Sequence, residues 1–358
     1  MRRVALLAVL GLLITSVTAE LASGLPMFTA LHEQKCNLCH VNPSGGKMRN
    51  TYGSQYFAQT EMAYKKIPLE EIERFQPQVS NSIWLGMDAR TLYHYDDNTK
   101  QSTFFQMEGN LYVQVQLSER VSAALFKGLY QGFEVFGLGY FLPYSGYVKV
   151  GKFQPAYGWK FADHTSFVRE YMLWPPVSED TGIEIGFFPH RVSASVGIFN
   201  GTSIPLDTDK GKAGAIRVEF RERINRLGFG LGGSFYANDT PQGAVNMYGP
   251  LWYLKFGKLL QLGEVDWLEN ADGVTSFATT QDLAYMPLQG LWLKFKFDYF
   301  DQNVDQNSLA IRRYGVSAQF FPIGFVELEP FLRLYETINE GDGSDTYVVG
   351  DVQAHFFF

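Results

Sequence analysis

Apolar and polar residues alternate along most of this chain, from about residue 81 to the C-terminus. The alternation is regular over residues 105–117, 216–221, 293–299 and 327–335, where one set of alternate residues is mainly apolar and the other mainly polar or charged. A period of two is that of a β-strand, whose successive side chains point to opposite faces of a sheet. The pattern predicts about sixteen strands, which start near residues 82, 101, 120, 131, 146, 182, 190, 212, 226, 243, 258, 274, 289, 308, 324 and 346.

The connections between these strands alternate in length. Those after the even-numbered strands are tight and lie at 118–120, 143–145, 189–190, 222–223, 257–258, 288–289 and 322–324. Those after the odd-numbered strands are mostly longer and polar, at 96–100, 157–181, 200–212, 237–243, 269–273, 301–308 and 339–345. This is the plan of an outer-membrane barrel, with short periplasmic turns and longer external loops. An even number of strands also places the region before the barrel on the periplasmic side.

A soluble β-sandwich would alternate in the same way, with its apolar face in a core. Aromatic residues, however, make up 16% of the chain and charged residues only 19%, which suits a barrel whose outer face meets lipid. In the last strand Val352, Ala354, Phe356 and Phe358 share one face. Such an ending resembles the signal by which outer-membrane barrels are recognised for insertion. The predicted fold class is therefore all-β, an antiparallel transmembrane barrel over residues 81–358 in contact with the lipid bilayer.

The first 19 residues read as a secretory signal peptide. Arg2 and Arg3 precede an apolar run over residues 4–17, and Thr18-Ala19 forms a small-residue cleavage site. The run is too short for a comfortable transmembrane helix, and no other stretch has 18 consecutive apolar residues. The formal net charge of −7 argues against nucleic acid as a partner.

Residues 20–80 contain the chain's two cysteines, in the string Cys36-Asn37-Leu38-Cys39-His40. This is the attachment pattern of a c-type haem, with covalent bonds to Cys36 and Cys39 and His40 as the proximal iron ligand. A redox pair of the thioredoxin kind would need a βαβ pattern nearby, and a zinc site would need a second Cys/His pair, neither of which we find. A disulfide across two residues would be strained. We therefore expect one haem c.

Around the motif we expect a Pro/Gly loop at 42–46, a helix from about Asn50 to Lys65, and a second helix that starts at Pro68. A segment of about 60 residues is small for an independent domain, and we predict that it plugs the lumen of the barrel or lies at its periplasmic entrance. The predicted lumen face is charged and includes Asp88, Arg90, Lys149, Arg217, Glu219, Lys294, Lys296, Glu327, Glu329 and Arg333.

The distal iron ligand is open among several residues. Met48, eight residues after His40, is the favoured candidate, because methionine is a common axial ligand. Met27, Met62, His32 and the lumen-facing His355 are alternatives. For each methionine, ordinary core packing is the simpler interpretation.

The long connection 157–181 contains His164, Arg169, Glu170, Trp174 and Glu179, and at this length a loop is expected to be functional. We expect it to fold over or into the mouth as a constriction. The acidic outer loops, at 96–97, 301–305 and 340–345, suggest a mouth that attracts cations. We find no catalytic triad elbow, phosphate loop or marked nucleophile.

The whole arrangement resembles the outer-membrane monohaem cytochrome–porin fusions of iron-oxidising bacteria. The string Pro26-Met27-Phe28, then Cys36 to His40, Asn50, Gly53 and Phe57, is also similar to a broader set of outer-membrane barrels with a single haem motif. The resemblance implies electron transfer across the outer membrane, between an extracellular donor or acceptor such as Fe(II) and a periplasmic cytochrome, with Fe(II):cytochrome c oxidoreductase activity as its enzymatic form. The alternative hypothesis is a solute-diffusion porin whose haem segment gates, senses or docks.

Overall fold

The computed structural model describes residues 26–128, 132–172, 178–204, 206–306, 310–338 and 344–358. Sixteen antiparallel strands, β2 to β17, form a closed barrel, because β17 pairs with β2 as well as with β16. The strands are β2 (Ile83–Asp96), β3 (Gln101–Ser118), β4 (Val121–Gly128), β5 (Phe133–Leu142), β6 (Gly146–Phe153), β7 (Asp180–Phe187), β8 (Val192–Phe199), β9 (Ala213–Ile224), β10 (Leu227–Thr240), β11 (Gly243–Phe256), β12 (Leu259–Glu269), β13 (Thr275–Leu288), β14 (Leu291–Asp301), β15 (Ala310–Ile323), β16 (Val326–Ile338) and β17 (Ser344–Phe357).

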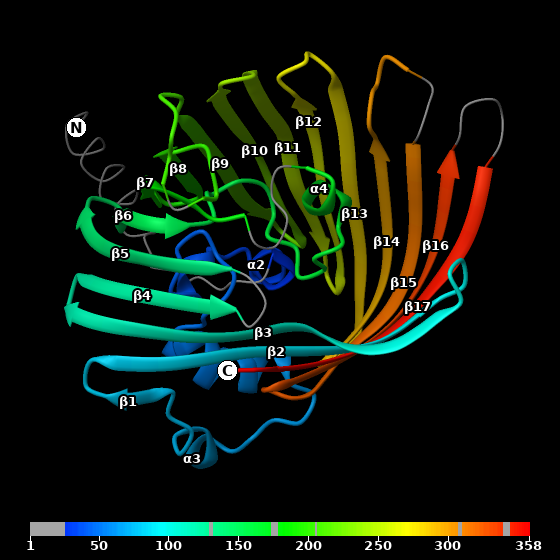
Figure 1. The fold of residues 1–358 in the computed structure, drawn as a ribbon. Helices are drawn as coiled ribbons and strands as arrows, with labels where there is room; N and C mark the ends of the chain where they lie inside the picture. Colours follow the sequence, from blue (N-terminus) through cyan, green and yellow to red (C-terminus); the bar gives the residue numbers. More distant parts are fainter. Residues whose placement is uncertain (1–25, 129–131, 173–177, 205, 307–309, 339–343) are drawn as a thin grey trace, which may run out of the picture.

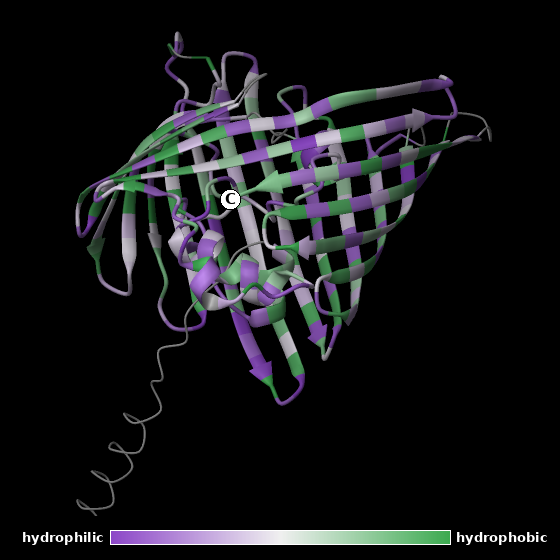
Figure 2. Cartoon of the chain, turned by 90° about the horizontal axis from the view of Figure 1, so that it is seen from below, coloured by the Kyte–Doolittle hydropathy of each residue, from purple (hydrophilic) through white to green (hydrophobic). Residues whose placement is uncertain are grey.

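The alternation of the sequence becomes the two faces of this barrel. Large apolar side chains such as Ile198, Leu231 and Phe256 are more than 60% exposed on its outer surface, and hydrophobic and hydrophilic positions alternate along each strand in Figure 2. A belt of exposed apolar residues on this scale is stable against lipid rather than water. The ten predicted lumen charges lie on the inner face, and Lys149, Glu219 and Glu329 are among those that are buried there. No described helix is long and apolar enough to cross a membrane.

The predicted asymmetry of the barrel ends is present with one exception. Short turns at 119–120, 143–145, 188–191, 225–226, 257–258, 289–290 and 324–325 define one rim, called here the short-turn rim. The opposite rim carries the longer connections, including 200–212 and 302–309. The prediction of a loop at 237–243 is wrong. β10 and β11 continue to Thr240 and from Gly243, which leaves only a two-residue turn, because these polar residues extend the hairpin above the apolar belt.

One strand departs from simple alternation. In the pairing of β2 with β3, Arg90 lies opposite Glu108 but Thr91 lies opposite Gln106, so Met107 is an extra residue in β3. Such a β-bulge re-aims the side chains around it. Phe105 and Met107 belong to the apolar set that alternates over residues 105–117, but the bulge takes them off the outer face: Phe105 pairs with the inward-facing Leu92, and Met107 lines two cavities inside the barrel.

The N-terminal segment lies at the short-turn rim and inside the barrel (Figures 1 and 2). It consists of α2 (Pro26–His32), η1 (Cys36–Leu38), the π-helical η2 (Tyr52–Met62), α3 (Leu69–Ile72) and the short strand β1 (Gln78–Ser80), which pairs with β2. Both expected helices are present: η2 is shorter than the predicted span from Asn50 to Lys65, and α3 begins one residue after Pro68. The elements α2 and β1 were not predicted. The predicted signal peptide lies outside the described residues.

The segment is tied to the barrel by hydrogen bonds at this rim. Lys35 donates to Phe188 O at 2.8 Å, and the Tyr64 N–H donates to Phe321 O at 2.8 Å. The Gln289 amide donates to Thr60 O at 2.8 Å. These bonds hold the segment at the rim that the barrel plan assigns to the periplasm.

The long connection between β6 and β7, residues 154–179, turns into the lumen, as predicted. Its short helix α4 (Phe167–Glu170) packs against β12, β13 and β14. Trp159, Phe161 and Phe167 are buried. Trp174, which was singled out in the sequence of this loop, lies outside the described residues, as does most of the acidic stretch 340–345.

Candidate haem site and the filled lumen

The haem motif forms a single tight turn. The N–H groups of Cys39 and His40 both donate to Cys36 O, at 3.3 Å and 3.1 Å. Cys39 and His40 are buried and Cys36 is half-buried. Cys36 and Cys39, both within the described residues, are not joined by a disulfide. The turn therefore places two reduced thiols and an imidazole on one short stretch of backbone, which is the donor set that covalent haem requires.

A small hairpin follows the motif and returns to it. Val41 N–H donates to Met48 O at 3.1 Å, Asn50 N–H donates to Cys39 O at 2.8 Å, and His40 lies opposite Arg49. Paired residues in such a bridge share a face, so His40 and Arg49 point one way, and Val41 and Met48 the other.

Asn50 and Gly53, which were singled out in the sequence only by resemblance, have physical roles. The Asn50 side chain donates to Leu38 O at 2.5 Å and accepts from the Gly53 N–H at 2.9 Å. A Cβ at Gly53 would lie 2.3 Å from Cys39 O. Only glycine lets η2 approach the haem motif this closely.

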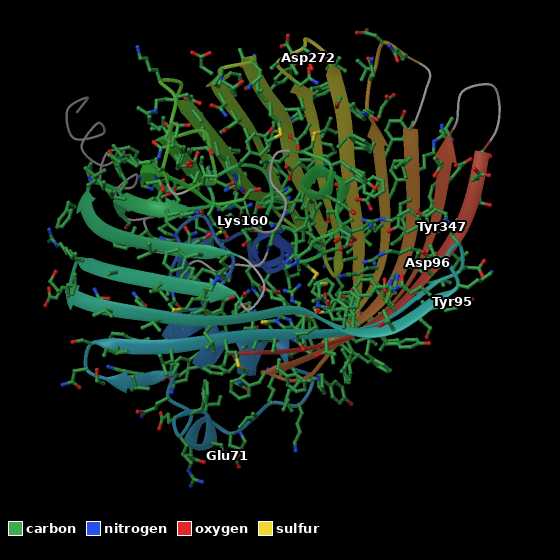
Figure 3. The ribbon with its side chains drawn as sticks, in the orientation of Figure 1. Glu71, Tyr95, Asp96, Lys160, Asp272 and Tyr347 are labelled. Carbon is green, nitrogen blue, oxygen red and sulfur yellow. The ribbon has the colours of Figure 1, made fainter. Side chains whose placement is uncertain are left out.

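The shared face of His40 and Arg49 lines a cavity of about 310 Å³ inside the barrel. The N-terminal segment, the wall formed by β2 to β5, and the loop 154–179 enclose it. Lys47 reaches Glu134 at 2.8 Å and Glu179 at 3.1 Å, and Lys160 donates to Ser44 Oγ and Gly45 O, both at 3.2 Å. Figure 3 shows Lys160 inside the barrel, between Glu71 at one end and Asp272 at the other.

These residues fit a haem. Gly45 has a φ of 87°, and a Cβ there would come within 3.1 Å of Cys36 Sγ, so glycine keeps the space beside this thiol open. Cys36, Cys39 and His40 would hold the group, and the cations Arg49 and Arg90 on the cavity wall suit its two carboxylates.

The methionines that were predicted as distal iron ligands are packed in apolar surroundings. Met48 is 1% exposed and packs on the far side of the hairpin, with its Cγ 3.3 Å from where a Cβ of Gly86 would lie. Met62 is buried in an aromatic cluster with Phe28 and Phe57, against which Met27 also packs. Met48 as distal ligand stays a prediction, and its side chain would have to turn to reach the His40 face.

The two histidines that were predicted as alternative iron ligands, His32 and His355, both contact other side chains. The ring of His32 packs edge-on to Phe57 with centroids 5.4 Å apart, and burial lowers its pKa. His355 bonds through both ring nitrogens, Nδ1 to Glu327 at 2.8 Å and Nε2 to Asp88 at 3.0 Å. It faces the lumen, as predicted.

Asp88 joins the barrel to the haem hairpin. Its carboxylate accepts from Arg49 at 3.2 Å as well as from His355, and Arg49 also lies 4.1 Å from the ring centroid of Phe357. The last strand of the barrel thus contacts the haem hairpin directly. The sequence predicted that Asp88 faces the lumen, but nothing in the sequence indicated that Arg49 would be its partner.

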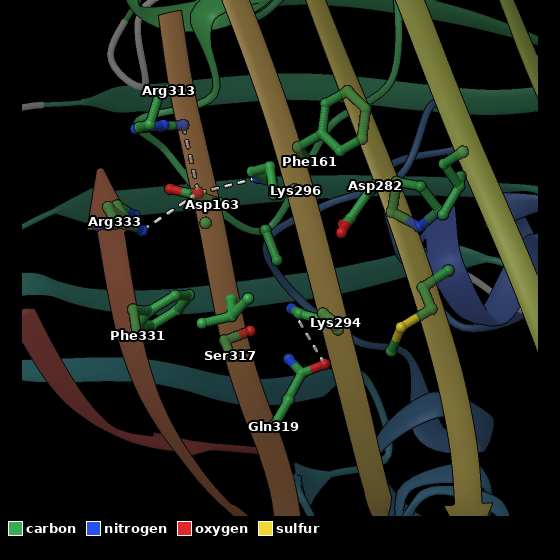
Figure 4. A pocket seen from close by; sticks show the side chains of 16 residues that line it. Phe161, Asp163, Asp282, Lys294, Lys296, Arg313, Ser317, Gln319, Phe331 and Arg333 are labelled. Carbon is green, nitrogen blue, oxygen red and sulfur yellow. Dashed lines mark hydrogen bonds and ion pairs between the residues drawn. The ribbon is translucent and has the colours of Figure 1, made fainter. Parts of the chain in front are cut away.

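The loop 154–179 is held by charge on the opposite wall. Asp163 contacts Lys296 at 2.9 Å, Arg333 at 3.2 Å and Arg313 at 3.7 Å, from β14, β16 and β15 (Figure 4). Burial opposes ionisation, but these three cations hold the pKa of Asp163 well below its usual range. Beside this contact lies only a small cavity of about 50 Å³. The loop forms the predicted constriction.

A second anchor pins the start of the loop. Tyr157 donates to Asp266 at 2.7 Å, and the Gly158 N–H donates to Ser234 Oγ at 2.9 Å. Gly158 has a φ of 50°, and a Cβ there would lie 1.9 Å from Glu264 Oε1. These anchors were not predicted, because their partners lie far apart in the sequence.

No family model matches the chain, and no curated protein matches it. Solved structures do. The Pseudomonas putida OprB structure has a TM-score of 0.62 at 10% identity, over 77% of this chain and 94% of that one. The anion-selective porin of Comamonas acidovorans has a TM-score of 0.54 at 12% identity, over 77% and 99%. The outer-membrane channel DcaP of Acinetobacter baumannii has a TM-score of 0.57 at 8% identity, over 79% and 99%. At these identities the likeness shows a common fold, the sixteen-stranded barrel of outer-membrane porins.

Among the described residues no group of three or more His, Cys, Asp or Glu could hold a metal ion.

Proposed function

We propose that this protein is an outer-membrane electron-transfer protein, with one c-type haem bound to Cys36, Cys39 and His40. The observation that carries the proposal is the seat of the haem motif: a tight turn inside the short-turn rim, with His40 on the wall of a lumenal cavity. When bound there, the haem supplies one-electron chemistry through its iron.

The chain's own residues support this role by filling part of the lumen. Lumen-facing charges such as Lys149, Asp298 and Arg313 are at most 1% exposed, because the N-terminal segment and the loop 154–179 cover them. The barrel would insulate the haem from lipid, and Arg49, held by Asp88, would fix the depth of the segment. The partners we propose are a periplasmic cytochrome at the short-turn rim and an extracellular donor or acceptor such as Fe(II) at the other, which would make the protein an Fe(II):cytochrome c oxidoreductase.

The second candidate is a solute-diffusion porin in which the N-terminal segment gates, senses or docks. The comparisons favour it over electron transfer, because the Comamonas acidovorans structure is described as an anion-selective porin and the Acinetobacter baumannii structure as an outer-membrane channel. The wall cations Lys294, Lys296, Arg313 and Arg333 around the constriction would then favour anions. The filled lumen and the haem motif are what favour the first candidate.

One set of liposomes separates the two. Purified protein is reconstituted with cytochrome c trapped inside, and the chain with both Cys36 and Cys39 changed to serine is the matched control. Electron transfer predicts reduction of trapped cytochrome by external Fe(II), loss of that reduction in the control, and no swelling in a small sugar. Rapid swelling by the haem-loaded protein, without cytochrome reduction, would overturn the proposal in favour of the porin.

A further inference from the structure

Two histidines line the cavity beside the haem motif. His40 comes from the N-terminal segment, and His164 comes from the loop 154–179. These two segments approach the cavity from separate parts of the chain, and the wall residues Arg90, Glu108 and Tyr112 lie on the same cavity. An imidazole on each bounding segment is an arrangement that could bind iron between them.

The other four of the six histidines are placed elsewhere. His355 uses both ring nitrogens on Glu327 and Asp88, and His94 bonds to Asp351 at 2.7 Å. His32 packs on Phe57 at 5.4 Å, and His190 is exposed in a turn of the short-turn rim. Only His164 shares the cavity of His40.

The backbone on both sides of His164 is fixed. Asp163 is bound by Lys296 and Arg333, and Thr165 Oγ1 accepts from Arg313 at 2.8 Å. The imidazole is half-buried, and its Nε2 lies 3.8 Å from Glu108 Oε2. This distance is too long for a hydrogen bond, so the contact with Glu108 leaves both ring nitrogens of His164 available to a metal.

Met107 is the competing ligand. The β-bulge turns it inward, so that it is the one methionine, among the described residues, on the wall of this cavity. Its side chain also lines a second, smaller cavity with Leu92 and Ala162. Packing between these residues is a sufficient reason for its position, whereas the imidazole of His164 makes no hydrogen bond with the described part of the chain.

We propose that His164 is the second axial ligand of the haem iron, so that each segment filling the lumen contributes one imidazole. This inference rests on the haem of the proposed function. It gives the loop 154–179 a role beyond constriction, because iron would link it to the N-terminal segment. Two histidine ligands also imply a lower reduction potential than histidine with methionine.

The test compares His164→Ala with Met107→Ala and with the matched control His94→Ala, which removes another lumen-facing histidine. Haem stain after denaturing electrophoresis first establishes that each protein carries covalent haem. Visible absorption and electron paramagnetic resonance then report the spin state of the ferric iron. We expect low-spin iron in the wild type, Met107→Ala and His94→Ala, and high-spin iron in His164→Ala. Added imidazole should restore the low-spin spectrum of His164→Ala, and His164→Met should raise the midpoint potential.

High-spin iron in the wild type, or low-spin iron retained by His164→Ala, would overturn the assignment. Loss of the low-spin spectrum only in Met107→Ala would assign the methionine instead. Absence of haem stain from the wild type is a different failure, because it removes the proposed function itself.

Discussion

Two segments fill the barrel, and they are held there in different ways. The N-terminal segment carries its own apolar cluster, in which Phe28, Phe57 and Met62 are buried together against the barrel wall. The loop 154–179 packs into a larger apolar cluster of the barrel, and polar bonds through Tyr157 and Asp163 also tie it to distant strands. The first segment is organised locally around its haem motif. The second has a position that depends on charges presented by the barrel.

The difference shows how a closed lumen can be built from a porin-type barrel. The segment before β2 enters through one rim and shares an apolar core with the barrel wall, and a loop that is tied at both ends is drawn in from the wall. Because the two segments meet at Lys160, which bonds to Ser44 and Gly45, changes in one should be felt by the other.

The largest effect should come from the N-terminal segment. Changing both Cys36 and Cys39 to serine is expected to abolish covalent haem, because both thioether bonds are removed. Haem stain after denaturing electrophoresis measures this. The barrel should still form, since neither cysteine lies on a strand, and its heat-modifiable migration is the control. Stain retained by the double variant would show that haem is attached elsewhere.

The second-largest effect is expected in the loop 154–179. Asp163→Asn leaves Lys296 without this buried partner and weakens the contacts of two arginines, so we expect the seated loop to lose about 3 kcal/mol. Single-channel conductance and protease cleavage of the loop should both rise. Asp209→Asn, in an exposed outer loop, is the matched control. Unchanged conductance and cleavage would mean that the loop is held mainly by its apolar contacts.

The contact between the two segments at Lys160 should depend on pH. Burial lowers the pKa of Lys160 from 10.5 to about 7. Between pH 7 and 10.5, the Lys160 amine is therefore mostly protonated when the loop is released and mostly neutral when the loop is seated. The free energy of seating the loop should become more favourable as the pH rises through this range, by about 1 kcal/mol per pH unit. Conductance as a function of pH reports the change. Lys160→Met should flatten the curve, and Lys152→Met should not. Equal slopes in both variants would exclude Lys160 as the cause.

The smallest effect is expected at the rim. Arg223 pairs with Glu33 of the N-terminal segment at 2.6 Å, but its side chain is 54% exposed and Lys255 also holds Glu33. Arg223→Ala should loosen the segment by only about 0.5 kcal/mol. Protease release of the segment on heating measures this, with Arg191→Ala at the same rim as control. A loss as large as that of Asp163→Asn would show that the segment depends on polar ties as the loop does.

The barrel was largely predictable because its information is local. Each of the sixteen strands starts within two residues of its predicted position, since alternation and turn residues are both read from neighbouring positions. The loop 237–243 was mistaken because polar residues in a projecting hairpin look like a loop. The inward turn of Met107 was missed because a bulge depends on the partner strand.

The candidate site divides in the same way. Cys36, Cys39 and His40 were identified from spacing alone, because their chemistry requires them within one turn. The bond of Arg49 to Asp88, the ion pairs of Asp163 and the shared cavity of His40 and His164 were not predicted. The sequence by itself determined the barrel, the lengths of most of its connections and the position of the haem motif in the chain. Only the tertiary structure decided what fills the lumen and which residues face His40, because closing the barrel brings together distant residues such as Asp88 and His355, which are 267 positions apart.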